Sequence, residues 1–173
     1  MELFLIFIAA VAFIFLLTAL IGAPYVPTHS SSLDKLLAEL DFRENDVFVD
    51  IGSGDGIVLK KFAEKGFEVV GFEINPFLVA ISKFRLRKMP KAKVRLVNFW
   101  QVFPLEKVDF LYTFGESRDI EKMFELAKVQ ANSQKSPVRF ISYGFKTKKQ
   151  KPSQKISGFF IYEILPENSS QSK

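Results

Sequence analysis

Apolar residues run without interruption through the start of the chain. From Leu3 to Ala23 the sequence holds 21 residues with no charge and no proline. A segment of roughly 20 apolar residues crosses a bilayer core as a helix, so this run predicts a transmembrane helix. A cleaved signal peptide is the alternative. It is disfavoured because no basic segment precedes the run and no small-residue cleavage site is evident.

After this run, apolar residues return at helical spacing. Residues 24–29 contain two prolines, which predict an extended connector. Ser31 and Asp34 then fit a capping box, which predicts the start of a helix. The helix is supported by leucines that recur with its period, namely Leu33, Leu36, Leu37 and Leu40.

Short runs rich in β-branched and aromatic residues alternate with helical segments along the rest of the chain. Val47–Ile51 and Glu68–Glu73 predict two strands, with a helix at 57–65 between them. Asn75 as N-cap and Pro76 at the first helical position predict another helix. Its apolar face is expected at Phe77, Ile81 and Phe84. Further strands are predicted at 93–97, 108–113, 138–143 and 156–165, with a helix at 118–131.

This alternation of strands and helices predicts the fold class. We expect an α/β, Rossmann-like sandwich with a mostly parallel sheet, preceded by one N-terminal transmembrane helix. The chain then divides into a transmembrane anchor (1–23), a connector and leading helix (24–45), an α/β domain (46–166) and a polar, disordered tail (167–173).

Charge and composition narrow the chemistry. All 24 Lys and Arg follow the apolar run, so the positive-inside tendency predicts a cytoplasmic domain on a single-pass membrane protein. The net charge is +5, and a mildly basic chain of this kind does not predict a nucleic-acid partner. The absence of cysteine excludes disulfides and thiolate nucleophiles. With one histidine and no clustered acids, no metal site is expected.

A glycine-rich loop follows the first predicted strand of the domain. Strand, loop and helix in this order place a nucleotide-like ligand across the carboxyl edge of a parallel sheet. Glu73 ends the next strand, 21 positions after Gly52, where a carboxylate can accept hydrogen bonds from both ribose hydroxyls. The loop reads Asp50-Ile51-Gly52-Ser53-Gly54-Asp55-Gly56.

Spacing and charge of this loop discriminate between ligands. A dinucleotide fingerprint requires glycine at position 57, which is Ile57. Asp50 and Asp55 would repel a pyrophosphate and attract a cation. S-adenosylmethionine carries a sulfonium and an ammonium, so it is the predicted cofactor.

These residues resemble class I methyltransferases, and more narrowly the membrane-anchored lysine methyltransferases that act on mitochondrial adenine nucleotide translocase and the ATP synthase c-subunit. The resemblance covers most of the chain and implies the Rossmann-like class I methyltransferase sandwich. Besides the apolar run and the glycine loop, it rests on the connector 24–27, the segment 71–79, Phe99-Trp100, Phe114-Gly115 and the aromatic strand 159–163.

The resemblance also implies which residues bind the cofactor. It implies contacts at Asp50, Gly52, Gly54 and Glu73, and adenine contacts near Asn98 and Phe99. The family usually has an acid where Asn98 stands, a lysine where Gln101 stands and an arginine near Ile57. The amide of Asn98 can still hydrogen-bond an adenine edge. Ser53, Gly56 and Ile74 complete the predicted cofactor-binding set.

Methyl transfer from a sulfonium is an in-line displacement, so the site must align a neutral nucleophile and exclude water. Lysine is the predicted acceptor, and aromatic walls would stabilise a methylammonium. Tyr112 is a further aromatic candidate, with core packing as its equal alternative. Glu116 is a candidate for taking the lysine proton, although a solvated surface carboxylate is the commoner outcome. The predicted catalytic residues are Trp100, Phe114, Glu116 and Tyr25.

The sequence therefore predicts a membrane-anchored, S-adenosylmethionine-dependent protein-lysine methyltransferase. Its partners would be the bilayer, through residues 3–23, and a protein substrate at the membrane. Cytosine C5 transfer is disfavoured because it needs a cysteine. Adenine N6 transfer is disfavoured because Thr113-Phe114-Gly115-Glu116 departs from the motif expected there. A small-molecule or lipid methyltransferase, and a non-catalytic, membrane-tethered cofactor-binding module, stay open.

Overall fold

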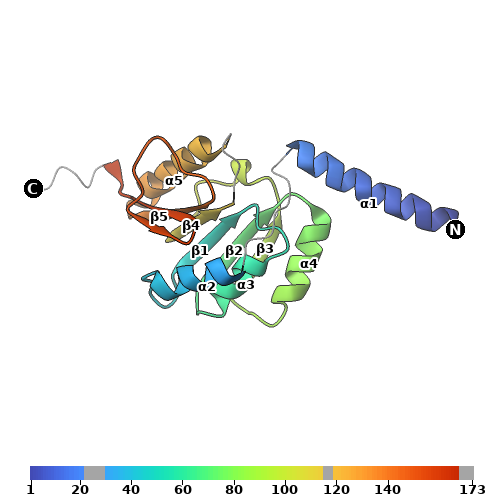
Figure 1. Cartoon of the computed structure of the whole chain (residues 1–173), viewed down its shortest axis with the longest axis horizontal. Coiled ribbons are helices and arrows are strands. Elements are labelled where there is room, and N and C mark those ends of the chain that lie inside the picture. Colours follow the sequence, from blue (N-terminus) through green and yellow to red (C-terminus); the bar gives the residue numbers. More distant parts are fainter. Residues whose placement is uncertain (22–29, 115–118, 168–173) are drawn as a thin grey trace, which may run out of the picture.

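The computed structural model describes residues 1–21, 30–114 and 119–167. Figure 1 shows an α/β domain from which the helix α1 (Glu2–Ile21) extends. In the part of the chain described here, no helix has both the length and the apolar character needed to cross a membrane. The transmembrane helix predicted for residues 3–23 is therefore not confirmed. The predicted connector, with Tyr25, lies outside the described residues.

One seven-stranded sheet organises the domain, in the order β3-β2-β1-β4-β5-β7-β6. The first five strands run parallel, whereas β7 pairs antiparallel with both β5 and β6. The strands are β1 (Val47–Ile51), β2 (Glu68–Glu73), β3 (Ala92–Leu96), β4 (Phe110–Thr113), β5 (Val138–Tyr143), β6 (Gln154–Ile156) and β7 (Phe159–Ile164).

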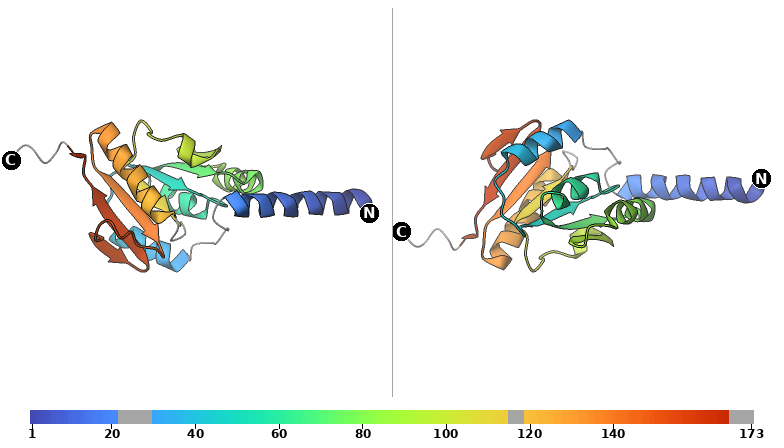
Figure 2. Two further views of the ribbon diagram at one scale, coloured as in Figure 1. Left: turned by 90° about the horizontal axis from the view of Figure 1, so that it is seen from above. Right: turned by 90° about the horizontal axis from the view of Figure 1, so that it is seen from below.

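Helices cover both faces of this sheet, as the two views in Figure 2 show. Helices α2 (Ser30–Glu39) and α3 (Ile57–Ala63) pack their buried leucine, valine and phenylalanine side chains on one face. Helix α5 (Ile120–Gln134) packs on the other. Side chains alternate between the two faces along a strand, so Phe48 of β1 joins the first layer and Val49 the second. The α/β sandwich with a mostly parallel sheet is confirmed.

The end of the chain folds differently from the prediction. A single strand was expected at 156–165, but the structure has two antiparallel strands, β6 and β7. Ser157 and Gly158 form the turn between them, with φ of 45° and 92°. Positive φ at both central residues is the signature of a tight hairpin turn whose twist matches the strands that it joins. The apolar pattern continues on both sides of the turn, which is why it resembled one strand.

Helix α4 (Pro76–Leu86) begins as predicted, but two of the three residues on its predicted apolar face, Ile81 and Phe84, do not pack in the core. Asn75 caps it, its side chain accepting hydrogen bonds from the backbone N–H groups of the first turn. Ile81 and Phe84, expected on the core side, are 47% and 69% exposed. The helix instead buries Leu78, Val79, Ser82 and Leu86. Both sets have helical spacing, so spacing alone selected the wrong side.

Candidate cofactor and active site

The loops that follow β1, β2 and β3 meet at the carboxyl edge of the parallel sheet. β1 has β2 on one side and β4 on the other. The chain therefore winds in opposite directions from this point, which is the topological switch point of the sheet. Ligands of open α/β sheets bind outside the carboxyl ends of the strands at such a point.

The glycine loop takes a left-handed backbone conformation, with positive φ, that glycine adopts more readily than other residues. Gly52, Gly54 and Gly56 have φ of 84°, 54° and 77°. The backbone N–H groups of Gly52 and Ser53 both donate to the carbonyl of Phe72 at 2.9 Å, which fixes the loop to β2. A Cβ at Gly56 would lie 2.1 Å from Oγ of Ser82 on α4. Glycine is thus required at position 56 both by the backbone and by the close packing of α4.

Backbone donors hold the Glu73 carboxylate beside this loop. Its Oε2 accepts from Gly54 N at 2.9 Å, and its Oε1 accepts from Ile74 N and Asn75 N, both at 2.8 Å. A carboxylate has roughly four lone-pair positions, so these three bonds leave acceptor capacity on Oε2. Glu73 therefore both shapes the loop and keeps one position for an incoming hydroxyl.

Asp50 is a buried acid without a full set of partners. Its side chain is 2% exposed, and Oδ1 has no hydrogen-bond partner among the described residues. Burial raises the pKa of the Asp50 carboxyl well above its ordinary value, and the charges of Glu73 and Asp55 raise it further. A buried, unsatisfied acceptor destabilises the protein unless a ligand completes it. A cationic ligand beside Asp50 would offset this cost.

The second loop acid, Asp55, has a partner within the protein. Arg85 of α4 forms an ion pair with Asp55 Oδ2 at 2.5 Å and donates to the Asp55 carbonyl at 2.8 Å. The expectation that both loop acids attract the ligand is therefore corrected, because Asp55 is already neutralised. Asp50 and Glu73 are the acids that a ligand at this edge would meet, and a cation there would favour the ionised form of Asp50.

The segment after β3 lies next to Glu73. The backbone N–H of Val97 donates to the Glu73 carbonyl at 3.0 Å. Asn98 then caps a single 3-10 turn, η1 (Phe99–Gln101), and its Oδ1 accepts from Trp100 N at 3.2 Å. The Phe99 and Trp100 rings pack at 4.5 Å, and Trp100 is 40% exposed. The structure thus brings the predicted adenine-binding segment to the same edge as the glycine loop.

The two aromatic residues predicted at the end of β4 have different environments. Tyr112 is 1% exposed and packs against Phe48 and Phe159, with ring centres 5.8 and 6.2 Å away. It is a core residue and not a wall of the acceptor site. Phe114 is only partly buried and meets Tyr143 edge to face at 4.9 Å. Phe114 stays a candidate, and Glu116 lies outside the described residues.

Comparison with known proteins gives relatives at modest identity. The chain is 45% identical over 62 residues to the ATP synthase c-subunit lysine N-methyltransferase of Xenopus laevis, covering 36% of this chain and 27% of that protein. It is 36% identical over 103 residues to the human protein of that name, covering 57% and 44%. It is also 34% identical over 65 residues to ribosomal RNA small subunit methyltransferase A of Thermotoga neapolitana, covering 38% and 25%. The chain spans less than half the length of these curated relatives, and no family model matches it.

A solved structure decides the fold. The RNA methyltransferase from Salinibacter ruber in complex with S-adenosyl-L-homocysteine superposes with a TM-score of 0.69 at 23% identity. The match covers 85% of this chain and 98% of that one. The chain has the class I S-adenosylmethionine-dependent methyltransferase fold. Resemblance at this level of identity concerns the arrangement of the backbone, so the side chains must carry the argument about function.

The sequence-based prediction did not include the two residues of α4 that hold the glycine loop. Ser82 packs against Gly56, and Arg85 pairs with Asp55, 30 positions away. A serine and an arginine on a helix carry no local signal for these roles. The opposite charges of Asp55 and Arg85 suggest an ion pair only once α4 is known to pack beside the loop.

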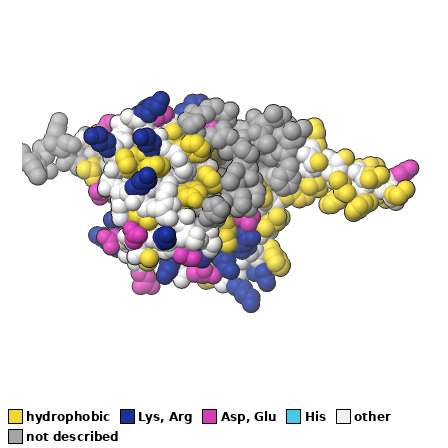
Figure 3. Space-filling model, viewed as in Figure 1, with side chains coloured by type: hydrophobic (Ala, Val, Ile, Leu, Met, Phe, Trp, Pro, Cys, Tyr) yellow, Lys and Arg dark blue, Asp and Glu magenta, His cyan; other side chains and the backbone are white. Residues whose placement is uncertain are grey.

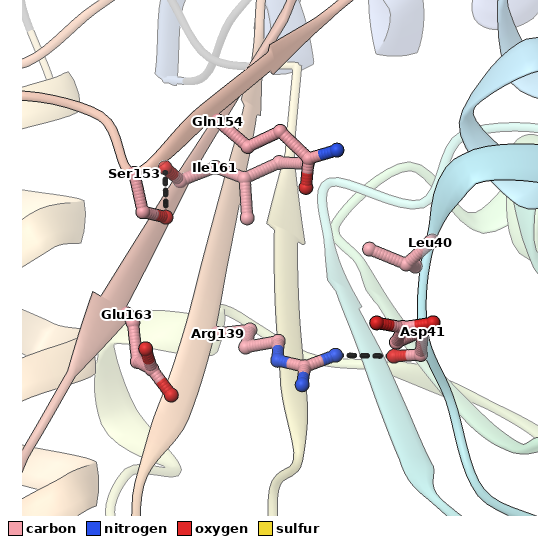
Figure 4. A pocket seen from close by; sticks show the side chains of 7 residues that line it. All are labelled: Leu40, Asp41, Arg139, Ser153, Gln154, Ile161 and Glu163. Carbon is pink, nitrogen blue, oxygen red and sulfur yellow. Dashed lines mark hydrogen bonds between the residues drawn. The ribbon is translucent and has the colours of Figure 1, made fainter.

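A separate cleft lies elsewhere on the methyltransferase fold (Figure 4). Arg139, Asp41 and Glu163 contribute polar side chains to it, and the Arg139 guanidinium donates a hydrogen bond to the Asp41 carbonyl. Arg139 is near the start of β5, so the cleft lies toward the amino edge of the parallel strands and away from the glycine loop. Over residues 1–21, 30–114 and 119–167, no group of three or more side chains is arranged to hold a metal ion.

Proposed function

We propose that this chain is an enzyme that binds S-adenosylmethionine at the glycine loop and transfers its methyl group. The observation that carries the proposal is the pair of acids around the loop: Asp50 with an unsatisfied buried oxygen, and Glu73 with an acceptor position left on Oε2. A cationic nucleoside fits this arrangement, because Glu73 would accept from a ribose hydroxyl and Asp50 would face the positive charge.

Isothermal titration of the full chain with S-adenosylhomocysteine tests this assignment. Replacing Glu73 by alanine is expected to weaken binding by about 1–3 kcal/mol, because a ribose hydroxyl and three backbone donors lose their acceptor. Glu68→Ala is the matched control, since Glu68 is an acid at the opposite end of the same strand and its side chain is 40% exposed. No heat of binding with the unmodified chain would refute the cofactor assignment.

The chain's own residues would align and desolvate the acceptor. Bound S-adenosylmethionine supplies an electrophilic methyl group on sulfur. Phe114 lies just beyond the end of β4, and Trp100 follows β3. An amine that packs against an aromatic ring is stabilised as positive charge develops on it. The amine must lose its proton before it reacts, since its ordinary pKa is about 10.4. Glu116 is the proposed group for orienting that amine or receiving the proton.

We infer that the acceptor is a lysine on a protein. Support comes from the Xenopus and human relatives, which are named as lysine methyltransferases of the ATP synthase c-subunit. Incubating the chain with labelled S-adenosylmethionine and membrane extract, then separating protein, lipid and RNA, tests this. Label on protein lysine supports the inference. Label in lipid or RNA would reassign the acceptor. Cofactor binding without any transfer would indicate a non-catalytic binding module.

We further propose that residues 3–23 attach the chain to a membrane as a single-pass anchor, with the domain on the cytoplasmic side. Support comes from the sequence, in which these residues carry no charge and every Lys and Arg follows them. Alkaline extraction of membranes tests attachment, and protease digestion of sealed vesicles tests the side. Release of the full chain by alkali would refute the anchor.

A further inference from the structure

Helix α4 exposes apolar side chains on the surface that it turns away from the sheet. Ile81 and Phe84 are 47% and 69% exposed. The guanidinium of Arg87 lies 4.0 Å from the centre of the Phe84 ring and donates to the Phe84 carbonyl. Exposed apolar side chains scattered singly are ordinary, but two on one face of a helix form a patch.

Cations surround this pair. Lys83, Arg87 and Lys88 are exposed, and none of the three forms an ion pair with the acids that the structure describes. The segment 74–105 contains seven basic residues and no acidic residue. It therefore contributes +7 to a chain of net charge +5, and the rest of the chain carries −2. Three exposed cations of this segment, Lys83, Arg87 and Lys88, lie on or just after the helix that exposes the apolar pair.

This surface lies at the end of the domain from which α1 extends, as Figures 1 and 2 show. Figure 3 shows Lys and Arg side chains gathered beside apolar ones over this part of the domain. Many described side chains of α1 are apolar and exposed as well, including Leu3, Phe4 and Phe7 at 84%, 65% and 61%. Exposed apolar side chains of α1 and of α4 thus occupy the same end of the molecule.

We propose that α4 docks on the surface of an anionic phospholipid bilayer. Ile81 and Phe84 enter the layer between headgroups and acyl chains, while Lys83, Arg87 and Lys88 meet the lipid phosphates. A helix with an apolar strip flanked by cations binds a membrane in this way. Each basic side chain close to anionic lipid strengthens binding by about fivefold. RNA would satisfy the cations but offers no apolar layer to Ile81, so the exposed pair favours lipid.

Docking through α4 would also orient the cofactor site. The outer side of the helix meets the membrane, while its inner side holds the glycine loop through Ser82 and Arg85. The carboxyl edge of the sheet is then kept at a set position relative to the bilayer. This docking does not require the apolar segment 3–23 to cross the bilayer, nor does it depend on the identity of the methyl acceptor.

The absence of cysteine makes a position-specific test possible in the full chain. A nitroxide spin label is attached to Ala80→Cys, at an exposed position of α4, and, as the matched control, to Val129→Cys, at a 51% exposed position of α5. Each protein is mixed with vesicles of phosphatidylcholine alone, or of phosphatidylcholine and phosphatidylglycerol. On the anionic vesicles, the label at position 80 should lose access to a water-soluble nickel complex and gain access to oxygen, while the label at 129 should not change.

Neutralising Lys83 or Lys88 by glutamine should lower the ratio of docked to undocked α4 by about fivefold each. A label at position 80 that stays as accessible as the label at 129 on anionic vesicles would overturn the proposal. Equal protection on neutral vesicles would overturn it too, since the cations would then have no part. Protection by single-stranded RNA that also displaces anionic vesicles would assign the surface to nucleic acid instead.

Discussion

The two sides of the candidate site differ in how firmly the protein holds them. On the cofactor side, Glu73 accepts from three backbone N–H groups, Gly56 packs against Ser82, and Arg85 pairs with Asp55. On the acceptor side, Phe114 is partly buried and Trp100 is 40% exposed. The backbone of the cofactor side is held by contacts within the protein, whereas the side chains of the acceptor residues keep exposed surface for a partner.

This difference separates cofactor binding from substrate choice. A loop that the protein already holds by hydrogen bonds needs little reorganisation when the cofactor binds, so little binding energy is lost to ordering. Exposed aromatic side chains contribute their energy only when an acceptor covers them. We therefore expect substitutions on the cofactor side to change stability and cofactor affinity together, and substitutions of exposed acceptor residues to change turnover at unchanged stability.

The largest effect should separate Tyr112 from Phe114, two residues apart on the chain. Tyr112→Ala removes a ring from the core and is expected to lower the free energy of unfolding by about 3–5 kcal/mol. Phe114→Ala should cost far less stability and should reduce methyl transfer. Urea denaturation and transfer assays on both variants measure this. Equal losses of stability would show that Phe114 is also a core residue.

The next effect tests why position 56 is glycine. Gly56→Ala strains a backbone with φ of 77° and places a Cβ against Ser82. Gly66→Ala imposes a similar strain, at φ of 94°, in open space. The difference between the two losses of unfolding free energy isolates the clash, expected at about 1–3 kcal/mol.

A double variant sharpens this result. Adding Ser82→Ala to Gly56→Ala removes the Oγ that lies nearest to the new Cβ and should recover part of the loss. It should recover nothing when added to Gly66→Ala. If both glycine variants lose the same stability and neither is rescued, the tight contact between the loop and α4 has no energetic weight.

Local signals explain why the cofactor side was more predictable from the sequence. The bounds predicted for β1 and β2 match the structure. Each strand is a short apolar run, and a glycine or an acid marks where the run ends. The start of α4 was predictable because Asn75 is a typical N-cap residue and Pro76 fits the first helical position. The predicted cofactor residues Asn98 and Phe99 follow directly after β3, and the hydrogen bond from Val97 N to the Glu73 carbonyl brings this segment to the same edge.

Long-range packing explains what could not be predicted. Tyr112 and Phe114 are both aromatic residues near the end of one strand, and the sequence does not distinguish them. Only the position of β7 decides that Tyr112 packs against Phe159. The buried face of α4 depends on which of two helical stripes meets α3 and the sheet. The pairing of Asp55 with Arg85 likewise arises only once α4 lies beside the loop. None of these contacts can be predicted from the residues that neighbour them in the sequence.

The effect of pH tests the buried acid of the cofactor side. The pKa of Asp50 is raised in the folded protein, so the folded state holds this proton more tightly than the unfolded chain. The contribution of Asp50 to unfolding free energy is therefore greatest below its ordinary pKa, about 3.9, and declines as pH rises toward the raised folded value. Asp50→Asn should abolish this decline. Denaturation curves over a series of pH values compare the two proteins.

Cofactor binding should couple to the same proton. A sulfonium near Asp50 favours its ionised form, so S-adenosylmethionine should release protons on binding, while S-adenosylhomocysteine, which lacks the sulfonium charge, should release fewer. Titration in buffers of different ionisation enthalpy counts the protons. Equal proton release by the two ligands in both proteins would show that Asp50 does not sense the charge of the cofactor.

The smallest expected effect concerns Arg85, which links the cofactor side to α4. Its ion pair with Asp55 is partly exposed, with side-chain exposures of 28% and 19%, so Arg85→Ala should cost only about 1 kcal/mol of stability. Cofactor affinity should still fall, because the glycine loop would lose the ion pair and the hydrogen bond that hold it to α4. Lys83→Ala is the control, being a nearby cation on the same helix with no contact to the loop. A fall in affinity for Arg85→Ala alone would show that α4 holds the cofactor side through this pair, whereas equal affinity in both variants would leave the backbone bonds of Glu73 as its sufficient support.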